Sequence, residues 1–424
     1  MVKFWLWVYN LFFLPLLWTG FRILSLFNGK IREGFKGRRN VLTEAQSWEF
    51  NSGKRVIIHS SSLGEYQQAI PIMTELRSRG YNVIVTFFSP SGFRNSKVPF
   101  EDVKKSYLPF DSYPNMKKFL SCVKPDMVIL MRYDLWFNFL YRAGRTNAQI
   151  IIANARYDEN DFWWNVPFVR SFKKTMYGMI DKMFAIDESD YANYTKLMEG
   201  TKTKIIQAGD SKFERVVEAA KNMKAKEVLP PKVYEGKKVF VIGSSWKDDE
   251  DIILPVIDKL QEYESNLLTI LVPHEPKETK ILAIENNLGE MYTGLKSIRY
   301  SDLANYAGEN LIIIDCIGIL MNLYSTAYVA YVGGGLRTGL HNVLEPAVFN
   351  IPVIFANRVK NSDEDEILSE KGCGIIIDSR NSFYRELRKV LSDKEYYDKL
   401  RHGCKEVFEE NSGTTKKIIQ NIIN

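Results

Sequence analysis

The sequence of 424 residues contains few of the side chains that form disulfide frameworks or metal sites. Its four cysteines are scattered and form no CxxC pair, which excludes a zinc-ribbon pattern and fits a reducing compartment. Its four histidines show no HExxH spacing. The sequence therefore predicts no metal site and no cofactor.

The chain also lacks an excess of charge over most of its length. Its formal net charge is +6, and residues 1–39 account for all of it, with seven basic residues against Glu33. Residues 40–424 therefore carry no net charge. A nucleic-acid partner is not expected, because phosphate backbones require a basic surface on the folded domain.

Only one long apolar run is present, and it lies at the N-terminus. Residues 4–21 are uncharged and rich in Trp, Leu and Phe, a length at the lower limit for spanning a bilayer. Asn10 and Pro15 weaken it as a span, and no small-residue cleavage site follows it. The basic residues between Lys30 and Arg39 would bind anionic headgroups on the cytoplasmic side. We expect residues 1–39 to form a membrane anchor that spans the bilayer or lies in its interface; a buried helix of the first domain is the alternative.

Short apolar runs then alternate with amphipathic segments, which is typical of a parallel sheet covered by helices. The predicted strands of the first half are 56–58, 83–86, 127–131, 150–153, 183–186 and 205–208, and those of the second half are 239–242, 267–271, 311–314, 329–332, 353–355 and 375–377. Helices are expected at 67–79, 115–122 and from 393 to 423.

A charged stretch interrupted by Pro230 and Pro231 divides the two halves. We predict an α/β protein with two doubly wound, Rossmann-like domains facing a cleft. The expected segments are a domain at 40–215, a linker at 216–238, a second domain at 239–405 and a C-terminal helix at 406–424. Ligands should lie at the carboxyl ends of the strands.

The segment 57–73 carries the first candidate for chemistry. A buried strand enters a Ser/Gly loop, and a helix begins near Glu65. This places Glu65 at the carboxyl end of the strand, where a carboxylate can accept a proton from an attacking hydroxyl. The structural alternative is that Glu65 only complements the N-terminus of the helix.

Two further segments have the form of phosphate loops. In 331–355 a strand ends in three glycines, and a helix is expected to begin near His341 and Asn342; Gly334, Gly335 and His341 could then bind an anion. Glu345 would accept hydrogen bonds from ribose hydroxyls. In 241–254 a strand ends at Gly243 and Ser244 before an acidic helix start. In both segments glycine packing and helix capping are the alternatives.

In their order and spacing, these segments resemble the family of 3-deoxy-D-manno-oct-2-ulosonic acid (Kdo) transferases. The resemblance extends from the apolar N-terminus to residue 415. The matching stretches are 59–65 (HSSSLGE), 107–111 (YLPFD), 134–138 (DLWFN), 154–156 (NAR), 209–213 (GDSKF), 243–245 (GSS), 333–334 (GG) and 341–346 (HNVLEP).

The resemblance implies a GT-B fold and an inverting, metal-independent transfer of Kdo from CMP-Kdo to a lipid A precursor. This reaction belongs to lipopolysaccharide core synthesis at the cytoplasmic face of the inner membrane. By resemblance, Glu65 is the general base and Lys212 stabilises the charge on the leaving phosphate. The resemblance assigns donor binding to Pro273, His274, Ile317, Gly318, Ile319, Asn342, Val343, Leu344 and Glu345.

Four departures from the family pattern stand out. Arg132 occupies a position that is usually acidic and is associated with the transition state. The stretch 273–276 lacks an arginine, Ile319 replaces a carboxylate, and the loop from 335 to 341 is short. These departures leave two alternatives: a GT-B transferase or epimerase that uses another nucleotide sugar, or a non-catalytic membrane-bound scaffold.

Overall fold

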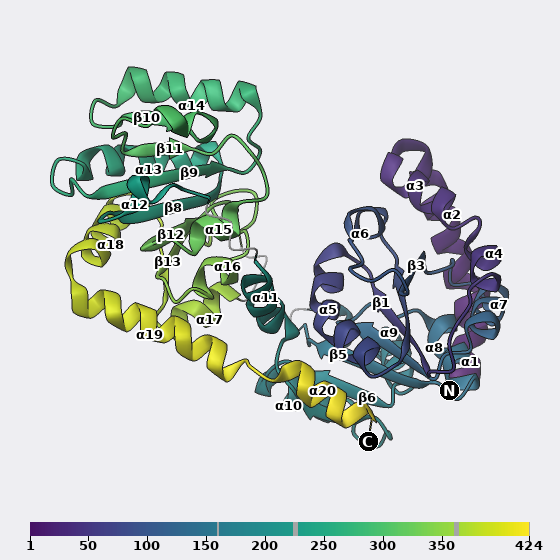
Figure 1. Ribbon diagram of the computed structural model, residues 1–424. Coiled ribbons are helices and arrows are strands. Elements are labelled where there is room, and N and C mark those ends of the chain that lie inside the picture. Colours follow the sequence, from purple (N-terminus) through teal and green to yellow (C-terminus); the bar gives the residue numbers. More distant parts are fainter. Residues whose placement is uncertain (159–160, 224–227, 360–363, 424) are drawn as a thin grey trace. The chain divides into compact units, whose positions relative to one another are not determined.

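The computed structural model describes residues 1–158, 161–223, 228–359 and 364–423. The chain folds into two compact units (Figure 1). The first comprises residues 1–215 together with 412–424, and the second comprises residues 216–411. Each unit contains one seven-stranded sheet, which confirms the α/β class and the presence of two doubly wound domains.

The sheet of the first unit has the order β3-β2-β1-β4-β5-β6-β7, and its paired strands are parallel. Its strands are β1 (Arg55–Ser60), β2 (Asn82–Phe87), β3 (Lys104–Tyr107), β4 (Met127–Met131), β5 (Gln149–Ala155), β6 (Lys182–Ala185) and β7 (Lys204–Gln207). The order reverses between β1 and β4, and the loops at such a point are where open α/β sheets bind ligands.

Helices cover both faces of this sheet, because successive strand residues point to opposite sides. Ile57 packs with α4, α7 and α8, whereas its neighbours Val56 and Ile58 pack with α5 and α20. The helices of this unit beyond the N-terminal segment are α4 (Val41–Gln46), α5 (Leu63–Ser78), α6 (Pro90–Asn95), α7 (Tyr113–Val123), α8 (Phe137–Arg145), η2 (Phe162–Asn165), α9 (Pro167–Tyr177), α10 (Glu188–Leu197), α11 (Ser211–Asn222, which crosses the unit boundary) and α20 (Thr414–Ile423).

The sheet of the second unit has the order β10-β11-β9-β8-β12-β13-β14, again with parallel pairs. Its strands are β8 (Lys238–Ser245), β9 (Leu267–Pro273), β10 (Ser297–Arg299), β11 (Leu311–Ile313), β12 (Val329–Val332), β13 (Val353–Phe355) and β14 (Gly374–Ile376). Its helices are α12 (Pro231–Tyr234), α13 (Lys247–Leu260), α14 (Glu278–Met291), η3 (Tyr300–Asn305), α15 (Leu320–Tyr324), α16 (Leu344–Ala347), α17 (Glu364–Glu370), α18 (Arg380–Ser392) and α19 (Lys394–Glu410). The reversal of strand order falls between β8 and β12.

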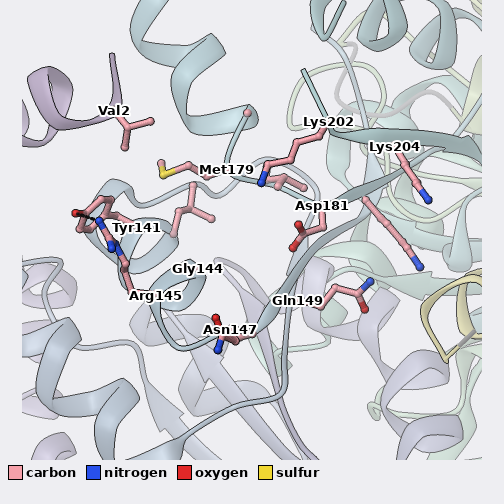
Figure 2. A pocket seen from close by; sticks show the side chains of 15 residues that line it. Val2, Tyr141, Gly144, Arg145, Asn147, Gln149, Met179, Asp181, Lys202 and Lys204 are labelled. Carbon is pink, nitrogen blue, oxygen red and sulfur yellow. Dashed lines mark hydrogen bonds between the residues drawn. The ribbon is translucent and has the colours of Figure 1, made fainter. Parts of the chain in front are cut away.

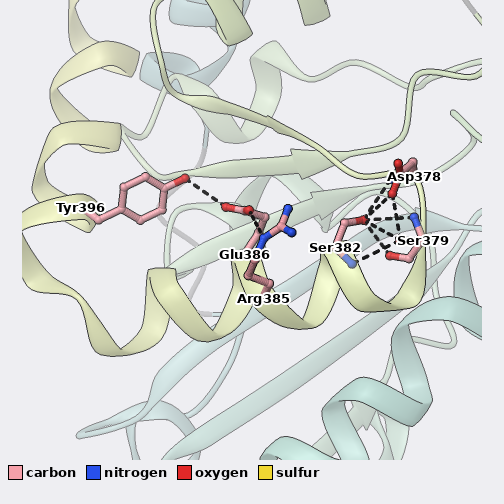
Figure 3. Close-up of polar contacts among 6 residues, drawn as sticks. All are labelled: Asp378, Ser379, Ser382, Arg385, Glu386 and Tyr396. Atoms are coloured by element: carbon pink, nitrogen blue, oxygen red, sulfur yellow. Dashed lines mark hydrogen bonds and ion pairs between the residues drawn. The ribbon is translucent and has the colours of Figure 1, made fainter.

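A serine cap fixes where α18 begins (Figure 3). Ser379 Oγ accepts a hydrogen bond from Ser382 N at 3.2 Å, and Ser382 Oγ accepts one from Ser379 N at 3.1 Å. Asp378 Oδ1 accepts from both hydroxyls at 2.8 Å. Reciprocal caps of this kind satisfy the free N–H groups of a first turn. Further along, Tyr396 of α19 donates to Glu386 at 3.3 Å and so ties the two helices together.

The N-terminal apolar segment is helical from Val2 to Phe27 and is the one described helix whose length and composition would allow it to cross a membrane. It consists of α1 (Val2–Val8), a π-helical turn at Tyr9–Phe13 and α2 (Leu14–Phe27). The turn lies just before Pro15, whose missing N–H disturbs the regular ladder. Asn28 then caps α3 (Gly29–Gly37) by accepting hydrogen bonds from Lys30 N and Ile31 N.

Several predicted boundaries differ from the structure. The C-terminal segment is two helices, because Gly413 adopts φ +81° between α19 and α20. The segment expected as a linker begins inside α11 and includes the helical turn α12; residues 224–227 lie outside the described residues. The helix expected near His341 begins only at Leu344 and has four residues.

Candidate active site

Glu65 lies at the start of α5, directly after β1. Ser62 caps this helix, and its Oγ accepts a hydrogen bond from Glu65 N at 3.3 Å. The Glu65 carboxylate accepts from Ser61 N at 2.5 Å and from Ser61 Oγ at 2.7 Å, and the residue is only 8% exposed. Burial raises the pKa of Glu65, while the two bonds from Ser61 lower it, so that the value stays above the ordinary one. Its position in the first turn of α5 is compatible with electrostatic complementation of the helix N-terminus, and a pKa raised in this way also suits a general base.

A buried histidine lies beside this carboxylate. His59 belongs to β1, and its ring nitrogens lie 2.9 Å from Thr86 Oγ1 and 2.9 Å from Asp134 Oδ2. Thr86 belongs to β2 and Asp134 follows β4, so three neighbouring strands build this contact. The charge of Asp134 raises the pKa of Glu65 and that of His59 lowers it, which places both groups within electrostatic reach. The sequence placed His59 and Asp134 in matching stretches but gave them no role.

Arg132 directly follows β4 and has an unusual backbone. Its φ is +61°, which is uncommon for a residue with a side chain. Its Nε donates to Gln68 Oε1 at 3.2 Å, and its guanidinium lies 4.0 Å from the carboxylate of Asp210. Gln68 is one helical turn after Glu65 on α5. Arg132 therefore links the end of β4 to the helix that carries Glu65.

A second set of polar contacts fixes the chain at Lys212. Asn154, at the end of β5, donates from Nδ2 to Asp210 Oδ1 at 2.9 Å and lies 3.1 Å from Gln68 Oε1. Asp210 Oδ1 also accepts from Lys212 N at 2.8 Å, and Ser211 Oγ donates to the backbone oxygen of Gln68 at 2.8 Å. These bonds bring Lys212 to the same sheet edge as Glu65. The sequence did not single out Gln68. It placed Asn154 in a matching stretch, but the bonds of Asn154 to Gln68 and Asp210 join residues that are far apart in the chain.

The glycine triplet of the second unit is packed against backbone. A Cβ on Gly335 would lie 1.6 Å from Ala356 O, and one on Gly333 would lie 2.4 Å from Ser244 O. The N–H of Gly333 donates to Gly243 O at 2.9 Å, and that of Gly334 donates to Asp249 Oδ2 at 3.0 Å. The expected phosphate-binding role is therefore corrected for Gly334, because its N–H is already bonded within the protein. Close packing explains the glycines.

Asp249, in the first turn of α13, ties this loop to the loop that follows β8. The residue is 1% exposed. Its carboxylate accepts from Trp246 N at 3.0 Å and from Tyr331 OH at 2.8 Å, in addition to Gly334 N. Burial raises the pKa of Asp249, and these bonds lower it. Asp249 is a site residue that sequence reasoning missed; the acidic helix start was noted, but its partners lie on another strand.

Gly243 and Ser244 belong to the last residues of β8, where the pairing with β9 is irregular, just before the turn that Asp249 holds. A Cβ on Gly243 would lie 1.8 Å from the Tyr324 hydroxyl, so glycine is needed here for packing as well. Ser244 adopts φ +53°, a left-handed backbone for a residue with a side chain. Strained conformations of this kind often occur at functional sites. Ser244 stays a predicted ligand contact.

Three aromatic rings stack at the carboxyl ends of β8, β9 and β12. The ring centroids of Trp246 and His274 are 4.5 Å apart, as are those of His274 and His341. Trp246 Nε1 also donates to His341 Nε2 at 3.3 Å, and Lys280 Nζ lies 4.9 Å from the centre of the Trp246 ring. Burial lowers the pKa of His341, and the charge of His274 lowers it further. The structure thus brings together the predicted residues His274 and His341, with Trp246 as an unpredicted member.

The remaining predicted donor residues divide into two groups. Val343 and Leu344 are 1% and 0% exposed and belong to the core, as does Pro273, so their side chains cannot contact a ligand. Asn342 is exposed; its Oδ1 accepts from Leu344 N at 3.1 Å and its Nδ2 donates to Glu345 at 3.2 Å. The accessible residues of the predicted set, in a loop after β11 and at the start of α16, are Ile317, Gly318, Ile319, Asn342 and Glu345.

The chain is similar to known glycosyltransferases. Residues 33–215 match the family described as 3-deoxy-D-manno-octulosonic-acid transferase (kdotransferase). The chain is 26% identical to the 3-deoxy-D-manno-octulosonic acid transferase of Haemophilus influenzae, covering 86% of this chain and 85% of the relative. It is 27% identical to a bifunctional glycosyltransferase/methyltransferase of Fusobacterium nucleatum, over 92% of this chain but only 60% of the relative.

Solved structures support the fold alone. A UDP-GlcNAc 2-epimerase from Neisseria meningitidis aligns with a TM-score of 0.61 at 14% identity, covering 87% of this chain and 99% of that structure. A glycosyltransferase from Rickettsia africae aligns with a TM-score of 0.53 at 12% identity, covering 87% of this chain and 98% of that structure. Both agree with the expected GT-B architecture.

Proposed function

We propose, from the premise that this chain is a glycosyltransferase related to the Kdo transferases, that it transfers Kdo from CMP-Kdo to a lipid A precursor. The reaction would take place at the cytoplasmic face of the inner membrane during lipopolysaccharide synthesis. The observation that carries the proposal is the buried carboxylate of Glu65 at the carboxyl end of β1, where the strand order reverses. Ligands of open α/β sheets bind at such a point.

In the proposed step, an acceptor hydroxyl oxygen forms a bond to C2 of Kdo while the bond from C2 to the phosphate oxygen breaks. The hydroxyl proton passes to Glu65, and CMP leaves with the bonding electron pair. Attack opposite the leaving group inverts the configuration at C2. Glu65 keeps lone pairs for this proton, since each carboxylate oxygen accepts only one described bond from Ser61.

The leaving phosphate requires compensation of its charge, and we assign this role to Lys212. A preorganised cation stabilises charge that develops in a transition state, most strongly where water is excluded. Asp210 and Asn154 fix the backbone at this position through the bonds described above. Arg132 acts as a positioning residue: by holding Gln68 it orients α5, and Asp210 balances its charge.

On the donor side, we assign the nucleotide to the exposed residues around the stack of Trp246, His274 and His341. Aromatic and imidazole rings can hold a nucleobase by its face. Asn342 and Glu345 offer amide and carboxylate groups to the ribose beside the stack. This set replaces the arginine that the stretch 273–276 lacks.

A ligand-binding comparison tests the proposed donor. The purified chain should show a higher melting temperature with CMP than with UDP, because a ligand stabilises the state that binds it. Lys212→Ala should still be stabilised by the free nucleotide CMP but should lose most transfer activity. Stabilisation by UDP alone would reject CMP-Kdo and favour the alternative, a GT-B transferase or epimerase with another nucleotide sugar.

A further inference from the structure

One face of the N-terminal helix is held by the first unit through buried aromatic contacts. Trp5 is 2% exposed, and its Nε1 donates to Ser171 Oγ at 3.3 Å. Its ring centroid lies 4.4 Å from that of Phe168 on α9. One turn further along, the Tyr9 ring stacks on Phe137 of α8 at 5.4 Å. This face belongs to the core of the unit.

Polar side chains take part in the same contact. Asn10 and Asn138 exchange two hydrogen bonds between their side-chain amides, each of 2.9 Å. The Tyr9 hydroxyl bonds to the carboxylate of Asp111, which also accepts from the backbone N–H groups of Asn138 and Phe139. Such a polar network is stable within a protein but costly against hydrocarbon, where partners are missing.

The far end of the helix returns to the same unit. The ring centroids of Phe21 and Phe88, the latter in the loop after β2, are 6.1 Å apart. After the bend at Asn28, Arg38 donates to Phe88 O at 2.5 Å and to Leu108 O at 3.0 Å. Trp5 and Phe21 are roughly 24 Å apart along a helix axis, close to the thickness of a bilayer core of about 30 Å. Figure 1 shows α1 and α2 running along the flank of the first unit up to α3.

Outside these contacts the helix exposes large apolar side chains, and in α2 they lie on all sides because only Leu14 and Ser25 are buried there. Aromatic residues of η2 and α9 are exposed as well. The exposed residues are Phe4, Trp7, Leu11, Phe12, Phe13, Leu16, Leu17, Trp18, Ile23, Leu24, Leu26 and Phe27, with Phe162, Trp163 and Phe168. A large exposed apolar surface of this kind marks a site of contact with a membrane.

Cations flank both ends of the helix. At its start, Val2 lines a cavity of about 680 Å³ whose other lining residues include Arg145, Asp181, Lys202 and Lys204 (Figure 2). At its end, the side chains from Lys30 to Arg39 supply basic residues. A spanning helix usually carries its positive charges on the cytoplasmic side. Charges at both ends fit a helix whose two ends lie at the headgroups of the same leaflet.

We propose that residues 2–27 lie in the plane of one leaflet and do not cross the bilayer. The partner of the exposed face is an anionic lipid monolayer, and the first unit lies against the same leaflet. A spanning orientation would carry Tyr9, Asn10 and the side of the unit that binds them into hydrocarbon. The inference rests on the proposed membrane location and adds the topology of the anchor.

Two tags on the full chain test this topology. An N-terminal and a C-terminal epitope tag are digested by protease in spheroplasts and in inverted inner-membrane vesicles. We expect both tags to be lost only in inverted vesicles. Loss of the N-terminal tag in spheroplasts and of the C-terminal tag only in inverted vesicles would overturn the proposal. An unrelated single-span anchor with the same tags is the control for that pattern.

A second measurement needs no tag and uses Lys3→Cys in a C122S/C316S background, which removes the two partly exposed cysteines. The new thiol should react with a membrane-impermeant maleimide in inverted vesicles and not in spheroplasts. Reaction in spheroplasts and not in inverted vesicles would overturn the proposal. Kdo transfer is measured in the same vesicles. If Kdo is transferred but the two tags lie on opposite sides of the membrane, the in-plane topology is rejected and the proposed function stands. If both tags lie on the cytoplasmic side but no Kdo is transferred, the proposed function is rejected and the topology stands. Recovery of the chain in the soluble fraction would overturn the membrane premise.

Discussion

Removal of the Asp249 carboxylate should destabilise the second unit far more than removal of the adjacent carboxylate of Asp248. In Asp249→Ala, three donors lose their acceptor: Trp246 N, Gly334 N and Tyr331 OH, which lie 3.0, 3.0 and 2.8 Å from the carboxylate. These groups hold the start of α13 and the loops after β8 and β12. The substitution therefore opens both loops of the predicted donor site.

The magnitude follows from the number of bonds that are lost. A buried donor left without its partner costs about 1–3 kcal/mol, so three donors amount to roughly 3–9 kcal/mol if their effects add. Burial of the carboxylate itself is unfavourable, as the raised pKa of Asp249 indicates. Its removal offsets part of the loss, and we expect a net destabilisation of about 3 kcal/mol. Tyr331→Phe, which removes one bond, should cost about 1 kcal/mol.

Hydrogen exchange measured by mass spectrometry on the full chain resolves this effect in peptides from β8 and α13. The matched control is Asp248→Ala, because Asp248 is the adjacent acid, and its side chain forms an exposed ion pair with Arg337 at 3.8 Å. Its effect should stay within about 0.5 kcal/mol. Equal effects of the two substitutions, or a loss below about 1 kcal/mol for Asp249→Ala, would refute the reasoning.

Two further outcomes follow from the same structure. Gly335→Ala should lower the melting temperature, because its Cβ would lie 1.6 Å from Ala356 O and overpacking costs about 1–3 kcal/mol. The control is Gly289→Ala in α14, where a Cβ meets no atom within 4 Å. This substitution should raise the melting temperature slightly, because glycine weakens a helix interior. The rate of transfer should fall as the pH drops through the pKa of Glu65, because only the ionised carboxylate accepts a proton. Since burial raises that pKa, the acid limb should lie above the ordinary glutamate value; a limb at or below that value would contradict the assignment.

The sequence predicted the interior of both sheets but missed one edge of each. Apolar runs such as 127–131 are unmistakable, because a parallel strand buried on both faces has little room for polar residues. The missed strands are β3, with the sequence KKSY, and β10, with the sequence SIR. Both lie at the outer edge of their sheets. Edge strands tend to be short and polar, which removes the hydrophobic signal.

The same distinction applies to the candidate site. Glu65 could be located from the sequence, because a strand, a Ser/Gly loop and a helix start follow one another within a few residues. The His59–Asp134 contact joins residues 75 positions apart, and its geometry depends on the pairing of β1 with β4. The glycine triplet suggested an anion loop, yet sequence alone cannot distinguish an N–H that is free from one that is bonded to a distant carboxylate such as Asp249.

The most direct test of the central claim is Kdo transfer by the purified chain, supplied with CMP-Kdo and a tetra-acylated lipid A precursor, beside Glu65→Gln. The account predicts CMP release by the native chain, with an acceptor that gains the mass of Kdo. The variant should be slower by about 10²–10⁴-fold, the usual contribution of general-base catalysis. It should keep the melting-temperature shift with CMP, which shows that it is folded. Equal rates for the two proteins, or no transfer by the folded native chain, would contradict the account.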